Sequence, residues 1–136
     1  MNTHLSISYS ALQGLTIALV GGDPRPAHLA RLKRAFGLLD VIHCPTRQSD
    51  PSPRCFLAAL HRPDLVLVVW LCGLSRTNHG KQLRAICNSQ CVPWLNCLHV
   101  PHPNLLAALI HEHRLLDPIL RRRVCLTAVD SSGGGR

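Results

Sequence analysis

Apolar runs with the length of β-strands are spaced along the chain, and polar, turn-rich segments separate them. The four clearest runs cover residues 15–20, 38–43, 65–70 and 92–98. The run at 65–70 is β-branched and apolar without a break, which is typical of a central strand that is buried on both faces of a sheet. A fifth run at 124–129 predicts one more strand, at the edge of that sheet.

The segments between the runs have the three-to-four-residue apolar spacing of amphipathic helices. We expect a helix that begins at Pro24 and further helices at residues 54–61, 79–89 and 104–116. Asp23 before Pro24 predicts an N-cap followed by a residue suited to the first turn. Gly37 predicts the end of that helix. Asp117-Pro118 predicts the interruption of the last one.

Strands that alternate with helices predict an α/β fold. We expect a small Rossmann-like or flavodoxin-like three-layer sandwich with a parallel sheet of four or five strands. Right-handed crossovers favour the strand order 2-1-3-4, with the fifth strand beside the fourth. The sequence predicts an N-terminal arm at residues 1–13, a single domain at 14–130 and a flexible tail at 131–136.

Glycines and polar side chains follow the predicted strands at their carboxyl ends, where open α/β sheets bind ligands. Gly21, Gly22 and Asp23 close the first strand. Glycine permits close approach to the backbone, and the start of a helix offers free N–H groups to an anion. The segment is neither a GxGxxG fingerprint nor a P-loop, and a tight turn with a helix cap is the alternative interpretation.

A second polar group, Asn78-His79, lies after the third predicted strand, across the switch point from the first loop. A histidine there can ligate a metal, bind a phosphate or exchange a proton. Ser75 in the preceding loop and Arg84 on the following helix complete the predicted ligand site. The alternative is that His79 bonds only to the backbone and that Arg84 is solvated.

Cysteines and histidines at the same edge suggest a metal or haem site. The candidate ligands are His79 together with Cys72, Cys97, His99 and His102. These residue types favour zinc or iron, and haem takes His or Cys as an axial ligand. Their spacing matches no recognised metal motif. Core cysteines and surface histidines are therefore the alternative.

The charge balance favours an anionic partner. The chain has 15 Lys and Arg against 7 Asp and Glu, for a formal net charge of +8. Arginine suits bidentate contact with phosphate, so nucleic acid or a phosphorylated small molecule is a candidate partner. The run at 121–123 is the densest such cluster. A solvated surface is the alternative, and 4% aromatic residues provide no stacking platform for single-stranded nucleic acid.

Neither a membrane span nor a secreted disulfide framework is expected. No apolar run reaches the roughly 18–20 residues that cross a bilayer, and the first residues lack the pattern of a signal peptide. The seven cysteines are odd in number. These features predict a cytoplasmic protein with reduced thiols.

Three segments together resemble a known family. They are V-G-G-D at the end of the first strand, D-L-V-L-V-V in the third, and L-S-R-T-N-H-G-K-Q-L-R-A-I-C leading into V-P-W-L. Over roughly residues 15–110 the chain resembles the bacterial domain of unknown function 2325 family. Gly21, Gly22 and His79 match its pattern, Arg84 stands for its basic residue, and Asn78 replaces its serine. The resemblance implies a Rossmann-like fold and supplies no established reaction.

The sequence contains no Ser-His-Asp order and no paired carboxylates, so enzymatic function is not the first expectation. We expect a sensor or accessory domain that binds a small anionic or redox-active ligand at the carboxyl edge. A haem or metal protein centred on His79 is one alternative. A nucleic-acid-binding protein and a phosphate-handling enzyme are others. The small domain and its exposed edge strand make a homodimer reasonable.

Overall fold

The computed structural model describes part of the chain. Its backbone covers residues 3–22, 25–44, 58–72 and 77–134, and its side chains cover residues 6–22, 25–44, 58–72 and 80–126.

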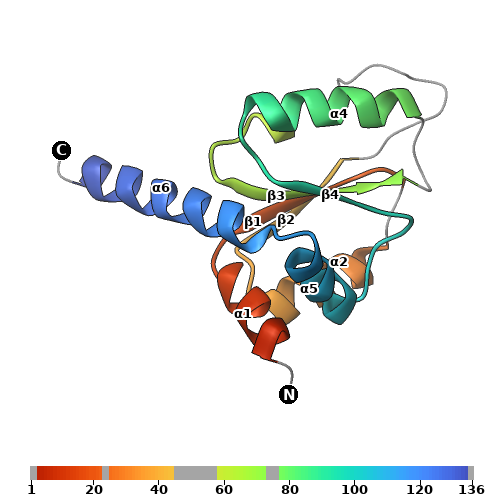
Figure 1. Cartoon of the computed structure of the whole chain (residues 1–136), viewed down its shortest axis with the longest axis horizontal. Helices are drawn as coiled ribbons and strands as arrows, with labels where there is room; N and C mark the ends of the chain where they lie inside the picture. Colours follow the sequence, from red (N-terminus) through yellow and green to blue (C-terminus); the bar gives the residue numbers. More distant parts are fainter. Residues whose placement is uncertain (1–2, 23–24, 45–57, 73–76, 135–136) are drawn as a thin grey trace.

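A four-stranded parallel sheet with the order β2-β1-β3-β4 forms the centre of the fold (Figure 1). Its strands are β1 (Thr16–Val20), β2 (Asp40–Cys44), β3 (Leu65–Leu71) and β4 (Trp94–Cys97). The predicted α/β class and the predicted strand order are therefore confirmed. Val20 pairs with Cys44 on one side and with Trp70 on the other, so the carboxyl ends of these strands meet at one edge.

Both faces of the sheet are covered. Every residue of β1 and β3 is buried, because these strands have a neighbour on each side and helices above and below. One face packs against α1 (Thr3–Ala11), α2 (Pro26–Phe36), α5 (Pro103–Glu112) and α6 (Leu116–Gly134). The other packs against α4 (Thr77–Ser89) and a short helical stretch at 58–60. The described helices include none with the length and apolar character needed to cross a membrane.

The two ends of α2 test the helix signals in the sequence. Gly37 ends the helix in the left-handed region at φ 62°, as predicted. The predicted start is wrong, because the N-cap is Arg25 and the helix begins at Pro26. Pro26 is suited to the first turn because an N–H at that position would have no acceptor within the helix. A proline there therefore costs no helical hydrogen bond. Asp23 and Pro24 lie outside the described residues.

The N-terminal segment is not an arm. Residues 3–11 form α1, and Ala11 and Leu12 are buried in the core. The ring of Tyr9 stacks on Phe36 of α2 with centroids 4.5 Å apart. Its hydroxyl donates to the Asn104 side chain at 2.5 Å. The sequence pattern was weak because Ser8, a polar residue, occupies a buried position on this helix.

The C-terminal segment is helical, so the predicted fifth strand at 124–129 is wrong. Asp117 and Pro118 lie in the first turn of α6, where an acidic side chain and a proline both favour helix initiation. The preceding helix ends earlier than expected, at Glu112, and Arg114 takes a left-handed conformation with φ 56°. Because α6 continues to Gly134, the predicted tail is helical over residues 131–134.

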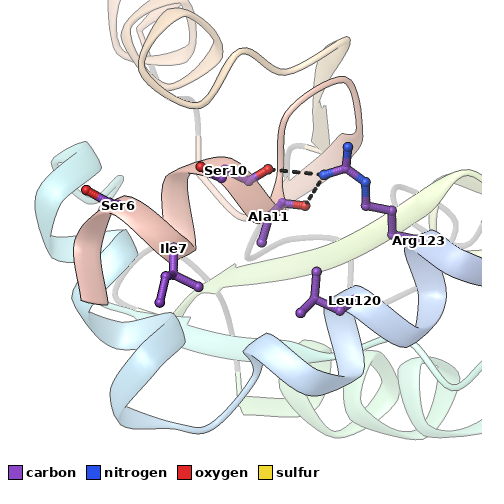
Figure 2. A pocket seen from close by; sticks show the side chains of 6 residues that line it. All are labelled: Ser6, Ile7, Ser10, Ala11, Leu120 and Arg123. Atoms are coloured by element: carbon purple, nitrogen blue, oxygen red, sulfur yellow. Dashed lines mark hydrogen bonds between the residues drawn. The ribbon is translucent and has the colours of Figure 1, made fainter. Parts of the chain in front are cut away.

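Two arginines attach α6 to the rest of the domain. Arg123 donates to the carbonyl oxygens of Ser10 and Ala11, both at 3.1 Å, at the end of α1 (Figure 2). Ile7 and Leu120 flank the hollow of about 420 Å³ that remains between the two helices.

Arg122 reaches the amino edge of the sheet. Its guanidinium donates to the carbonyl oxygen of Leu65, at the start of β3, and to that of Gln90 at 3.2 Å, just before β4. Longer contacts join it to the carbonyl oxygens of Arg62 and Pro63. Burial lowers the pKa of Arg122. One side chain therefore links α6 to two loops at this edge.

We expect Arg122→Ala to lower the free energy of unfolding by about 2 kcal/mol, because it removes charged donors from several carbonyl oxygens, three of them partly buried. Arg121→Ala is the matched control. Arg121 is exposed, and its replacement should change stability by less than about 0.5 kcal/mol. Urea denaturation measures both, and equal losses for the two variants would contradict this role of Arg122.

Candidate functional site

The Gly21-Gly22 turn follows β1 at the carboxyl edge. Both residues have positive φ angles, 128° and 54°, which glycine adopts without strain. The N–H of Gly21 donates to the Cys44 carbonyl oxygen at 2.9 Å and so extends the pairing of β1 with β2. This N–H is therefore occupied, and a ligand at the turn depends on other donors.

His43 holds the turn in place. Its Nε2 lies 3.1 Å from the carbonyl oxygens of both Gly21 and Gly22. Because both partners only accept hydrogen bonds, Nε2 carries a proton and donates it. His43 is not among the site residues predicted from the sequence. Its role could have been predicted from its position, because it ends a predicted strand that lies beside the strand of the glycine turn.

The third element of the edge is the start of α4. The helix begins at Thr77, so Asn78 and His79 lie in its first turn, where backbone N–H groups have no helical acceptors. Ser75 and Asp23 lie outside the described residues, as do the side chains of Asn78 and His79. Their predicted ligand contacts stay predictions.

Trp70 lies one residue before the end of β3 and is only 9% exposed. Its indole Nε1 has no hydrogen-bond acceptor among the described residues. The six-membered part of its ring packs on Gly80, where an added Cβ would stand 2.2 Å from the nearest ring carbon. Gly80 thus permits the first turn of α4 to approach the end of β3. A glycine inside a predicted helix was the signal for this contact.

Charge is distributed unevenly over the described residues. Their carboxylates lie towards the amino edge: Asp40 begins β2, Asp64 precedes β3, Glu112 ends α5 and Asp117 begins α6. The exposed cations Arg25 and Lys81 lie near the carboxyl edge, and Arg84 follows one turn later on α4. Cations also lie at the amino edge, where Arg121 and Arg122 are found, so the described carboxyl edge differs mainly in holding no described carboxylate.

The predicted metal ligands come together only in part. Cys72 follows β3, and Cys97 ends the neighbouring strand β4. Burial, and next the nearby Cys72, raise the pKa of Cys97 to about 11. His99 is exposed beyond the strand. His102 caps α5 by accepting the Asn104 N–H at Nδ1. Within the described ranges, no group of three or more His, Cys, Asp or Glu side chains could hold a metal ion.

The arginine run predicted to contact phosphate is largely engaged with the protein itself. Arg122 and Arg123 donate to backbone carbonyl oxygens, as described above. Arg121 remains exposed.

Comparison of the chain with protein-family models, with curated proteins and with solved structures finds no match. The resemblance to the domain of unknown function 2325 family therefore stays an expectation from the sequence.

Gly80→Ala should destabilise the fold by about 1–3 kcal/mol, because the added methyl group overlaps the Trp70 ring. Helix propensity alone predicts the opposite, a gain of about 1 kcal/mol. Thermal denaturation with far-ultraviolet circular dichroism measures the change. In a Trp70→Leu background the methyl group has room, and the same substitution should become neutral or stabilising. A stabilising Gly80→Ala in the presence of Trp70 would refute the contact.

Stability should fall in alkaline solution, from pH about 9 upwards. Burial raises the thiol pKa of Cys97 to about 11 and that of Cys87 to about 12. Between the ordinary thiol pKa and these values, the unfolded chain releases protons that the folded chain keeps, so deprotonation favours unfolding. Urea denaturation at pH about 8 and about 10.5 tests this, and Cys97→Ala should reduce the difference between the two. An unchanged difference in that variant would exclude Cys97 as a contributor.

Proposed function

We propose that the domain binds a small anionic ligand at the carboxyl edge of the sheet, between β1 and β3, and acts as a sensor or accessory domain. The strand order β2-β1-β3-β4 supports this location. The chain crosses in opposite directions after β1 and after β2, which creates a switch point between β1 and β3, where open α/β sheets bind ligands.

The unpartnered donor of Trp70 is the observation that carries the proposal. A buried N–H without an acceptor costs roughly 1–3 kcal/mol. A ligand oxygen at the end of β3 would satisfy this donor. The Trp70 ring also packs on Gly80 in the first turn of α4. The indole and the backbone N–H groups of that turn, which have no acceptor within the helix, are therefore neighbours, and both favour an acceptor.

The surrounding charges and the turn support the same ligand class. Lys81 is exposed on α4 one residue after Gly80, and Arg25 is the exposed residue that precedes α2. The Gly21-Gly22 turn, held by His43, forms the wall on the β1 side. In this proposal His79 is the polar anchor, which agrees with the resemblance to the domain of unknown function 2325 family.

Fluorescence titration tests binding directly. The chain has two tryptophans, so a Trp94→Phe background leaves Trp70 as the only indole. Inorganic phosphate and a nucleoside monophosphate serve as probes, with chloride as the control. We expect a saturable change of Trp70 emission with at least one phosphate probe. Calorimetry on Trp70→Phe should show affinity lowered about tenfold, the equivalent of one hydrogen bond.

The two lysines provide a matched pair. Lys81 lies near the proposed site, whereas Lys33 lies near the opposite end of α2, and both are exposed. Lys81→Gln should weaken phosphate binding several-fold at low salt, and Lys33→Gln should not. If both substitutions weakened phosphate binding equally, the lysines would act through the overall charge of the domain and not through a local site. Absence of binding to either phosphate probe, in a chain that purifies with haem, zinc or iron, would overturn the proposal in favour of a His79-centred metal site.

A further inference from the structure

A second chemically distinctive site lies at the opposite, amino edge of the sheet and is independent of the proposed anion site. A hollow of about 310 Å³ there is lined by Cys91, Pro118, Arg121, Arg122 and Cys125. Two cysteines and two arginines thus share one small cavity at the point where α6 meets the turn before β4.

Both thiols are accessible and come from different elements. Cys91 lies in the turn between α4 and β4, is exposed and has a left-handed backbone with φ 56°. Cys125 is exposed on α6, three residues after Arg122, and so lies on the same helix face as that arginine.

Arg122 brings the two cysteines together. Its guanidinium donates to the carbonyl oxygen of Gln90 at 3.2 Å, which holds the adjacent Cys91 under α6. Burial lowers the pKa of Arg122, whereas negative charge on Cys91 or Cys125 would raise it. Both sulfur atoms are therefore close enough to interact electrostatically with this guanidinium.

The charges around the pair oppose a metal ion. Arg121 and Arg122 are permanently cationic and suit contact with the carboxylates of a small anionic disulfide. A metal cation would meet these same charges. The part of the chain that the structure describes supplies no set of three or more His, Cys, Asp or Glu ligands for one.

We propose that Cys91 and Cys125 form a reversible thiol–disulfide exchange site that reacts with a small, carboxylate-bearing disulfide such as glutathione disulfide. One protein thiolate attacks the external disulfide, forms a mixed disulfide and releases one small thiol. The second protein thiolate then attacks the protein sulfur of the mixed disulfide and releases the other. The protein dithiol is oxidised to a disulfide, and the external disulfide is reduced to two small thiols. The two protons of the protein thiols end on these released thiols. The product joins α6 covalently to the turn before β4.

The test exposes the fully reduced, folded chain to glutathione disulfide and follows its intact mass and its non-reduced peptide map. We expect a loss of two hydrogen atoms and one linked peptide pair containing Cys91 and Cys125. Cys91→Ser and Cys125→Ser should each stop at a mixed disulfide with one glutathione. Cys72→Ser, which leaves both cysteines in place, should still form the bridge.

Two further measurements make the proposal specific. Arg121→Gln should slow the reaction several-fold at low salt, because it removes a charge that attracts the carboxylates of the disulfide. The bridge should raise the thermal midpoint, and a reductant should reverse that rise. Separate glutathione adducts on both cysteines without a bridge, a bridge through another cysteine pair, or a bridge formed only in urea would overturn the proposal.

Discussion

The complete burial of β3 between β1 and β4 is the constraint on which the rest of the structure depends. A strand with neighbours on both sides and helices on both faces must be apolar throughout. Polar residues on this segment of the chain are therefore confined to the positions before Leu65 at one edge of the sheet and after Leu71 at the other. Arg122 meets the first boundary, and Trp70 with Cys72 lies at the second.

The elements that the sequence predicted well are those with a strong local signal. The unbroken apolar run at 65–70 predicted the central strand, which extends one residue further to Leu71, and Gly37 predicted the left-handed end of α2. The C-terminal helix was misassigned because Val124 and its neighbours are apolar in succession, which is equally typical of a strand. Asp117-Pro118 was interpreted as a stop, although the same pair begins a helix.

The candidate site was predictable in its location but not in its contacts. Strand order alone brings the Gly21-Gly22 turn beside the start of α4. The hydrogen bonds from His43 to the turn depend on the register of β2 against β1, and the packing of Trp70 on Gly80 depends on the height of α4 above the sheet. Neither quantity is contained in a residue pattern, because both are decided by tertiary packing.

The attachment of α6 has a mechanical consequence. Arg122 and Arg123 hold this helix near its middle, and the part beyond them extends away from the sheet (Figure 1). The helix continues to Gly134, and at about 1.5 Å per residue the part beyond Arg123 measures about 17 Å. The geometry makes its far end sensitive to its attachment: a tilt of about 10° about the arginine pair would displace Gly134 by about 3 Å, which is larger than the shift at the amino edge that would produce it.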